Sequence, residues 1–286
     1  MLQQLKDATN RILRPLNMQV QTLTAERRDD SRLRELEQRG HFEKPIFPLL
    51  RGMSDGSLKW VADAARAHAE DLHGLMSGSA VPGKFCPKND YLRGSDAEML
   101  YLFVRTRRPR RIVEIGVGNS TRVIRQAIAD GNLKVKHIAI DPEPRIDIDD
   151  ASDQLVRKRL EDLAPEDQSR VFSSLESGDI LFLDSSHEVR LGNDVVHLFC
   201  NILPTLKPGV CIHVHDIFLP YEYPWEFAWN YRSWNEQYLL QVFLAASGRE
   251  VLWPGFYLRQ CREQDFRSIP FASGHEIRPQ SLWFRS

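Results

Sequence analysis

The chain has 286 residues, enough for one α/β domain of roughly 200 residues with extensions, or for two smaller domains. Its 42% hydrophobic and 27% charged residues are ordinary for a globular protein and argue against a disordered or fibrous class. Because 38 Lys and Arg face 39 Asp and Glu, the formal net charge is −1, and nucleic acid is a poor default partner.

The cysteines and the N-terminus suggest a compartment. The four cysteines are far apart without CxxC spacing, which favours free thiols in a reducing cytoplasm; they are Cys86, Cys200, Cys211 and Cys261. No apolar run approaches the roughly 18 residues of a membrane span, and the first residues lack the apolar core of a signal peptide. We therefore expect an untargeted cytoplasmic protein.

Residues 1–50 differ from the rest of the chain. Apolar residues near the N-terminus fall at helical spacing, and a mixed-charge run then predicts a solvent-facing helix that ends near Gly40. We interpret this segment as a cap over a substrate site or an oligomer contact, or as a plain packing extension. One amphipathic helix is expected over 56–76. A helical extension of residues 1–90 would then precede a main domain of residues 91–286.

The main domain begins with a helix and a strand that leads into glycines. A capping box of Ser95 and Glu98 predicts a helix over 96–105. The β-branched run 111–115 predicts a buried strand, and Gly116 and Gly118 after it allow a tight turn and close approach of a ligand.

Strands then alternate with helices to the end of the chain. Strands are expected over 135–141, weakly near 155–163, and over 179–184, 210–216, 249–254 and 281–286. This alternation predicts an α/β, Rossmann-like fold with a mostly parallel seven-stranded sheet and helices on both faces. Ligands of such sheets bind at the carboxyl ends of the strands, where we expect Asp141, Asp184 and Asp216.

The glycine turn is compatible with two classes of ligand, a dinucleotide and a ligand that carries a cationic group. A dinucleotide fingerprint would place a third glycine where Thr121 stands and does not need an acid at Glu114. An acid there suits a ligand with a cationic amino or sulfonium group and would repel a pyrophosphate. The residues therefore favour a cationic ligand over a nicotinamide dinucleotide.

On these residues the chain resembles the class I S-adenosylmethionine (SAM)-dependent methyltransferases. The resemblance is carried by EIGVGNST at 114–121, ID at 140–141 and DSSH at 184–187, in that order, and it covers roughly residues 91–286. The run over 178–195 and the segment with HVHD at 213–216 look like a bacterial branch whose substrates are mostly unassigned.

The resemblance implies roles for the binding residues. Asp141 would accept both ribose hydroxyls, and the glycines would let the methionine part lie against the backbone. Glu114 would organise the turn or bind the amino group, while Glu161 or Asp162 would lie near the adenine. The residues expected to bind SAM are Glu114, Gly116, Gly118, Ser120, Asp141, Asp162 and Asp184.

A second group of residues raises the question of a metal. Related O-methyltransferases use acids at the ends of adjacent strands to hold a divalent metal that activates two vicinal hydroxyls. Antibiotic-tailoring relatives usually have glutamate before the last acid, and catechol-type relatives have asparagine after it. Here His215 precedes Asp216 and Ile217 follows it, so a metal on Asp184, His215 and Asp216 stays an open alternative.

Without a metal, a histidine could act as the general base. His187 or His215 would remove the proton of an acceptor hydroxyl, with Asp184 as a further catalytic residue. Alternation along the strand places His213 and His215 on one face, with His215 nearer the edge and His213 expected to pack in the core.

Aromatic residues after the fifth strand predict either an acceptor lid or plain core. They are Tyr221, Tyr223, Trp225, Trp229, Tyr231 and Trp234, of which Tyr223 and Trp234 are the candidates for substrate contact.

These observations lead to one functional hypothesis with alternatives. We expect a class I methyltransferase that uses SAM, with a divalent metal as an option, to O-methylate a sugar or secondary-metabolite hydroxyl. We expect a small-molecule acceptor, no nucleic acid, no membrane, and a homo-oligomer through the N-terminal extension as an option. The alternatives are an NAD-dependent oxidoreductase, a SAM hydrolase and a catalytically silent SAM-binding scaffold.

Overall fold

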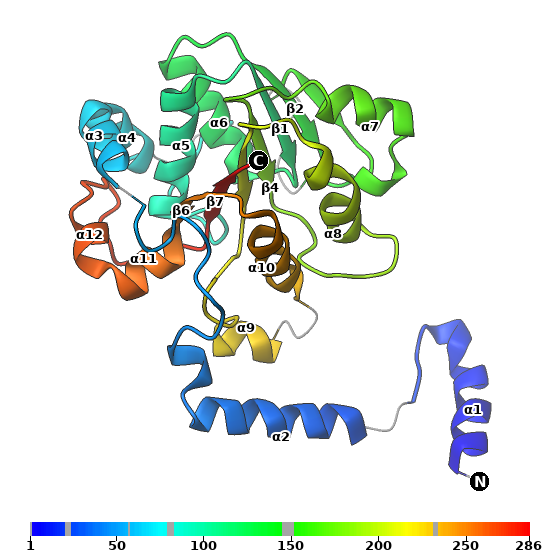
Figure 1. Ribbon diagram of the computed structural model, residues 1–286. Coiled ribbons are helices and arrows are strands. Elements are labelled where there is room, and N and C mark those ends of the chain that lie inside the picture. The colour runs from blue at the N-terminus through cyan, green and yellow to red at the C-terminus, as the bar shows by residue number, and fades with distance from the viewer. Residues whose placement is uncertain (1, 21–23, 57, 79–82, 145–151, 231–233) are drawn as a thin grey trace. The chain divides into compact units, whose positions relative to one another are not determined.

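The chain divides into two compact units, Met1–Lys44 and Pro45–Ser286 (Figure 1). The domain boundary expected at residue 90 is a different division, and it stays a prediction. The part of the chain that the computed structural model describes comprises residues 2–20, 24–56, 58–78, 83–144, 152–230 and 234–286.

The first unit is helical. Its elements are α1 (Leu2–Leu13), a 3-10 turn (Arg14–Leu16), α2 (Thr24–Gln38) and a second 3-10 turn (His41–Glu43). On α2, Glu35 pairs with Arg32 at 2.9 Å and with Arg39 one turn later, which is the charge spacing that supports an exposed helix. Gly40 follows the helix with a φ of 63°, a conformation that glycine adopts without strain. The predicted helix end near Gly40 is confirmed.

The second unit begins with helices that differ in detail from the prediction. In place of one helix over 56–76 there are two, α3 (Lys59–Ala67) and α4 (Ala69–Met76), because His68 leaves the helical conformation with a φ of −116°. The predicted capping box is wrong. Helix α5 (Ser95–Arg107) already includes Ser95, and its N-terminus has no side-chain cap.

Two buried acids of α5 instead hold the C-terminal part of the chain. Glu98 accepts hydrogen bonds from the backbone N–H groups of residues 272–273, at 2.6 and 3.1 Å. Asp96 accepts from the N–H groups of residues 280–281 at 2.7 and 3.2 Å. Glu98 is unavailable as a cap because it satisfies these distant donors, whose burial without an acceptor would be costly.

A seven-stranded sheet forms the centre of the second unit, as predicted. Its order is β3-β2-β1-β4-β5-β7-β6; β7 pairs antiparallel with both β5 and β6, and the other neighbouring strands pair parallel. The strands are β1 (Arg111–Ile115), β2 (Lys136–Ile140), β3 (Gln154–Val156), β4 (Ile180–Leu183), β5 (Cys211–Val214), β6 (Val251–Pro254) and β7 (Leu282–Arg285).

Helices cover both faces of the sheet. Figure 1 shows α5 and α6 on one side and α7, α8 and α10 on the other. The remaining elements after β1 are α6 (Asn119–Asp130), a 3-10 turn (Leu160–Asp162), α7 (Pro165–Phe172), α8 (Asp194–His197), a π-helical turn (Leu198–Ile202), a 3-10 turn (Leu203–Thr205), α9 (Trp225–Asn230), α10 (Glu236–Ser247), α11 (Gly255–Cys261) and α12 (Glu263–Arg267).

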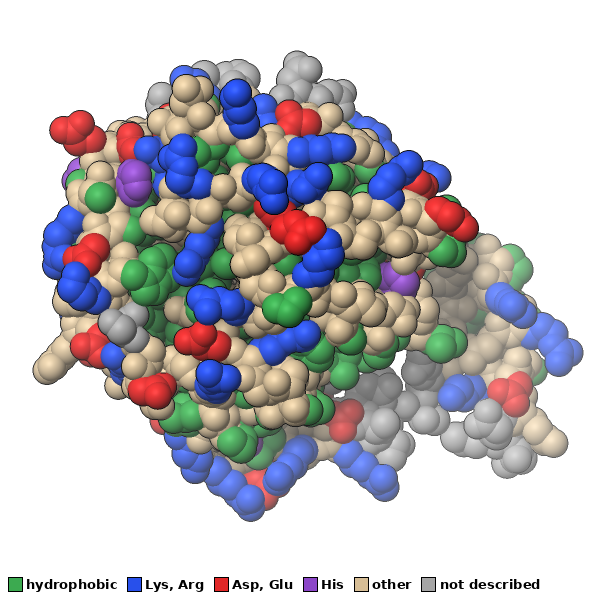
Figure 2. Space-filling model, turned by 45° about the horizontal axis from the view of Figure 1, so that its top comes forward, with side chains coloured by type: hydrophobic (Ala, Val, Ile, Leu, Met, Phe, Trp, Pro, Cys, Tyr) green, Lys and Arg blue, Asp and Glu red, His purple; other side chains and the backbone are tan. Residues whose placement is uncertain are grey.

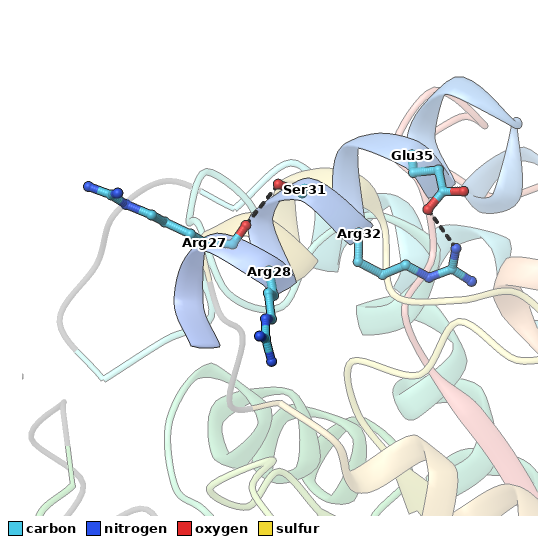
Figure 3. A pocket seen from close by; sticks show the side chains of 5 residues that line it. All are labelled: Arg27, Arg28, Ser31, Arg32 and Glu35. Atoms are coloured by element: carbon cyan, nitrogen blue, oxygen red, sulfur yellow. Dashed lines mark hydrogen bonds and ion pairs between the residues drawn. The ribbon is translucent and has the colours of Figure 1, made fainter. Parts of the chain in front are cut away.

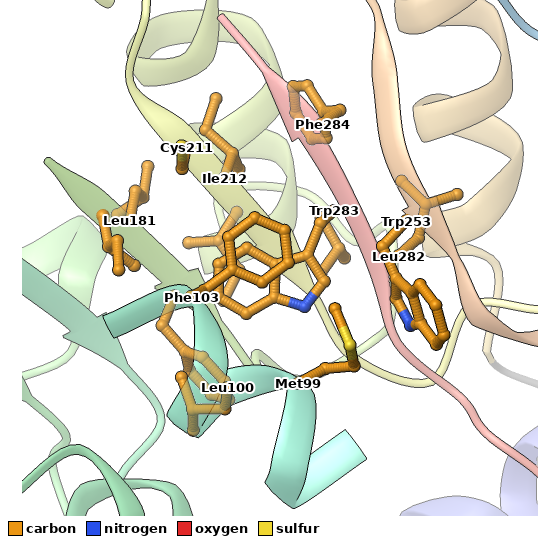
Figure 4. Close-up of a cluster of buried hydrophobic side chains, with 14 of the residues drawn as sticks. Met99, Leu100, Phe103, Leu181, Cys211, Ile212, Trp253, Leu282, Trp283 and Phe284 are labelled. Atoms are coloured by element: carbon orange, nitrogen blue, oxygen red, sulfur yellow. The ribbon is translucent and has the colours of Figure 1, made fainter. Parts of the chain in front are cut away.

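The core joins α5 to the antiparallel end of the sheet. Phe103 of α5 stacks on Trp283 of β7 with ring centroids 3.8 Å apart, and Met99 and Leu100 lie beside them (Figure 4). All four side chains are fully buried. Each buried large apolar side chain contributes about 1.5–3 kcal/mol to stability, so this cluster fixes α5 against the sheet.

The strand register aligns the parallel strand ends. Ile115 pairs with Ile140 on one side and with Leu183 on the other, and Leu183 pairs with Val214. The residues that come next therefore lie along one edge: Gly116, Asp141, Asp184 and His215. The sheet thus brings together side chains that are far apart in the sequence.

On the face in Figure 2, Lys and Arg side chains are interspersed with acidic and uncharged groups. Among the described residues, no helix has both the length and the apolar character needed to cross a membrane.

Replacing Glu98 by Ala should lower the free energy of unfolding by about 2–4 kcal/mol, because buried N–H groups lose their acceptor. Urea unfolding measures this change. The control is Glu250→Ala, which removes a half-exposed partner of Arg285 and should cost less than about 1 kcal/mol. Equal unfolding midpoints for the two variants would contradict the assigned role of Glu98.

Candidate active site

The turn after β1 packs directly on the end of β4. Gly116 has a φ of 78°, and a Cβ at this position would come within 1.8 Å of the carbonyl oxygen of Asp184. Only glycine fits there. Gly118 is different, since a Cβ at this position would meet nothing within 4 Å. Gly116 is therefore required for the turn to pack on the end of β4, and Gly118 leaves open space above the turn.

Glu114 organises this turn from below. It is fully buried, and it accepts hydrogen bonds from the hydroxyls of Ser120 at 2.6 Å and Thr121 at 2.9 Å. His137 of β2 lies 3.0 Å from the same carboxylate. The Thr121 hydroxyl also accepts the N–H of Gly118 at 3.2 Å, which explains a threonine where a dinucleotide site has its third glycine. Of the two roles predicted for Glu114, these contacts support organisation of the turn.

Asp141 borders the same turn from the end of β2. One carboxylate oxygen accepts the N–H of Val117 at 2.8 Å, and the other accepts the N–H of Glu143 at 2.8 Å. The side chain is half-buried. A carboxylate offers about four lone-pair sites, so two contacts leave acceptors for a ligand.

Asp184, His187 and Asp216 meet beyond the ends of β4 and β5. Nε2 of His187 lies 3.2 Å from Oδ1 of Asp184 and 3.5 Å from Oδ2 of Asp216. One potential ligand atom from each residue lies within 4.8 Å of the others. His187 and Asp216 have positive φ angles of 62° and 55°, which are uncommon for residues other than glycine and occur more often at functional sites.

Sequence reasoning missed Glu236, which lies at the start of α10. Its Oε2 is 3.0 Å from Nδ1 of His187, and its Oε1 accepts the hydroxyl of Ser185 at 3.1 Å. The carboxylate is buried. An acid in the first turn of a helix has an ordinary explanation in the helix dipole, so its position in the sequence gave no indication of this contact.

The other two histidines lie deeper. His213 is buried in β5 and stacks on Phe182 with ring centroids 4.0 Å apart, as expected of a core residue. His215 is also buried, and its Nε2 is 3.9 Å from Oδ1 of Asp216. Both Asp184 and Asp216 therefore lie near Nε2 of His187, whereas the predicted metal set contained His215 in its place.

Burial and charge act against each other in this cluster. Burial by itself would lower the pKa of His187, but hydrogen bonds to Asp184 and Glu236 and the charge of Asp216 raise that pKa well above its usual value. Burial would raise the pKa of Asp184, but the hydrogen bond from His187 and the charge of His215 lower it to about 2. The carboxylates around His187 thus favour its charged form over the neutral one.

Aromatic side chains lie next to His187. The ring of Trp234 is 4.4 Å from the His187 ring, centroid to centroid. Tyr223 is buried, and its hydroxyl accepts the N–H of Gln237 at 3.1 Å, so it belongs to a core cluster. Trp225 and Trp229 contact each other at 5.3 Å. Tyr231 lies outside the described residues.

Two further features involve residues that are not part of this cluster. Asp162 is exposed in the 3-10 turn after β3, and its predicted role near an adenine stays a prediction. A hollow on the surface of α2 shares no residue with the site and is lined by Arg27, Arg28, Ser31, Arg32 and Glu35 (Figure 3).

Comparison with known proteins finds a family match over part of the chain. Residues 113–217 match the family model described as "Methyltransferase domain". A comparison with curated proteins finds no match.

Several solved structures are similar at low identity. The O-methyltransferase TomG from Streptomyces achromogenes, involved in tomaymycin synthesis and in complex with SAM, is 16% identical over 80% of this chain and 90% of its own, with a TM-score of 0.38. An O-methyltransferase from Bacillus cereus in complex with SAH is 14% identical over 82% and 93%, with a TM-score of 0.38. A putative methyltransferase from Thermobifida fusca is 13% identical over 82% and 97%, with a TM-score of 0.42.

The family match covers the glycine turn and the three strand-end aspartates. Residues 113–217 thus match a methyltransferase domain, and they lie on the Rossmann-like sheet that is expected of class I SAM-dependent methyltransferases.

Proposed function

We propose that this protein is a SAM-dependent methyltransferase that transfers a methyl group to a hydroxyl of a small molecule. One observation carries the proposal: the segment matched to the methyltransferase family contains the open glycine turn and all three acids at the carboxyl edge of the sheet. In open α/β sheets that edge is where ligands bind.

The residues around the turn suit SAM. Gly118 leaves room above the turn, and Asp141 keeps lone pairs for ribose hydroxyls. Glu114 would contribute indirectly, because its hydrogen bonds to Ser120 and Thr121 fix the turn. Asp184 is part-exposed beside Gly116, where it would adjoin the methionine end of the ligand.

A divalent cation fits the acceptor side of the site. Asp184, His187 and Asp216 would hold it, and the contact of His187 Nδ1 with Glu236 is typical of a metal-binding histidine. A bound cation would orient an acceptor hydroxyl and stabilise its deprotonated form. The donor set therefore fits the group, although the set differs from the predicted Asp184, His215 and Asp216.

The transfer is an in-line displacement. The acceptor oxygen forms a bond to the methyl carbon as the carbon–sulfur bond of the sulfonium breaks, and the hydroxyl proton is lost to water. Burial acts to lower the pKa values of His187 and His215, but nearby carboxylates raise both of them. Without a metal, His187 or His215 would take the hydroxyl proton as the general base in place of water. Alignment of acceptor and methyl group would supply much of the acceleration.

The acceptor class remains a sugar or secondary-metabolite hydroxyl. Trp234, next to His187, supports this assignment because an aromatic face can stack on a sugar or aromatic ring. Tyr223 would act only through packing, since it is buried.

The proposed setting is cytoplasmic, without nucleic acid or membrane partners. All four cysteines are free, which suits a reducing compartment. The nearly balanced charge supports the exclusion of nucleic acid.

Replacing Asp141 by Ala should weaken SAM binding by about 100-fold or more, because two charge-assisted hydrogen bonds of about 1.5–3 kcal/mol each would be lost. Calorimetry with SAM measures this change. The control, Asp167→Ala, removes a half-exposed acid of α7 paired with Arg170 and should leave SAM affinity unchanged. Normal SAM binding by the Asp141 variant would disprove its assignment.

The activity itself is tested with SAM labelled in its methyl group. Incubation with a cell extract should label a small molecule, and a chelator should reduce the label if a cation holds the acceptor. Binding of NAD without binding of SAM would support an oxidoreductase. SAM binding without any labelled product under any metal condition would instead support a silent binding protein.

The N-terminal unit is proposed to contact a second copy of the chain. Its exposed apolar side chains include Leu5, Ile12 and Leu16. Sedimentation should give a species of twice the 33.1 kDa chain mass, which Leu5→Ser with Ile12→Ser converts to a monomer. The control Leu191→Ser changes an exposed residue elsewhere and should leave the dimer intact. A monomeric wild-type chain would exclude this contact.

A further inference from the structure

Glu236 has no part in the binding of SAM proposed above, yet it is the best-buried carboxylate of the acceptor side. It is 1% exposed, compared with side-chain exposures of 14% for Asp216 and 39% for Asp184. Burial of a charged carboxylate is unfavourable unless hydrogen bonds satisfy it. Ser185 and His187 provide those bonds, one to each oxygen.

We propose that Glu236 is a positioning residue that makes His187 the nitrogen ligand of a divalent transition metal. The inference rests on the proposed methyltransferase site and deepens it. By accepting the Nδ1 proton of His187, Glu236 leaves Nε2 directed at Asp184 and Asp216. The ring nitrogen bound to a metal is set by the hydrogen bond of the other nitrogen.

The backbone around His187 is held independently of this carboxylate. The N–H groups of Asn235 and Glu236 donate to the carbonyl of His187 at 3.0 and 3.2 Å. The side chain of Asn235 accepts the N–H of Val189, and a β-bridge joins Glu188 to Trp234. Removal of the Glu236 carboxylate therefore releases the imidazole ring but not the chain that carries it.

The ligand set determines which cation is preferred. Mg²⁺ favours six oxygen ligands in near-ideal octahedral geometry, whereas imidazole suits first-row transition metals. One nitrogen and two carboxylates from Asp184, His187 and Asp216 form a set that favours Mn²⁺ or Zn²⁺ over Mg²⁺. A site with acids alone would lack this selectivity.

The test measures binding of Mn²⁺ and Mg²⁺ to the full chain, by calorimetry and by the loss of the free Mn²⁺ EPR signal. Wild-type protein should bind one Mn²⁺ per chain at least tenfold more tightly than Mg²⁺. Glu236→Ala should weaken Mn²⁺ binding by about 10- to 100-fold. Glu236→Gln keeps a carbonyl oxygen for the Nδ1 proton and should restore part of the affinity. His187→Asn should reduce the preference for Mn²⁺ over Mg²⁺.

The control is Glu226→Ala, which removes an exposed acid paired with Arg278 and should leave Mn²⁺ affinity unchanged. SAM affinity, measured in parallel, separates this proposal from the proposed function: normal SAM binding without Mn²⁺ binding overturns the inference about Glu236 alone. The inference is also overturned if Glu236→Ala and Glu236→Gln both bind Mn²⁺ as the wild type does. If Glu236→Ala does not fold, Mn²⁺ binding by Glu236→Gln and by His187→Asn tests the inference in its place.

Discussion

The contact between the turn after β1 and the end of β4 is the constraint on which the rest of the site depends. Gly116 lies so close to the carbonyl of Asp184 that no other residue fits, and the N–H of Asp184 donates to Ile115 at 2.9 Å. The N–H of Gly116 in turn donates to Ile140 at 3.1 Å. Three strand ends are thereby joined at one point, and a ligand bound above the turn, as proposed, would lie beside Asp184.

Two buried glutamates each hold neighbouring polar groups in place, one on either side of this contact. Glu114 binds two hydroxyls and His137 below the glycine turn, and Glu236 binds one hydroxyl and His187 beyond the ends of β4 and β5. Each is satisfied by its neighbours, so each acts by fixing the groups that would face a ligand. A buried carboxylate with hydrogen bonds to both oxygens is held in place, because a lost partner leaves an unpaired polar group in low dielectric.

Several features of the site were predictable because they depend on short stretches of sequence. The β-branched strands, the glycine turn and the acids at the strand ends follow from patterns of two to eight residues, and parallel pairing places their carboxyl ends together. Predictions from local patterns were wrong at two places in the chain, at one of them because a distant partner competes. Glu98 has the spacing of a capping residue, but it binds the backbone near residue 272, and the helix expected over 56–76 breaks at His68.

The sequence by itself determined the order of strands and helices along the chain, the strand-end edge where we propose that a ligand binds, and the match of residues 113–217 to a methyltransferase family model. Only the tertiary structure decided that His187, and not His215, lies between Asp184 and Asp216, and that Glu236 supports it. The reason is physical. Strand ends are brought together by a regular hydrogen-bonded register, but the direction of a side chain in a loop depends on a partner 49 residues away, for which the sequence carries no periodic pattern.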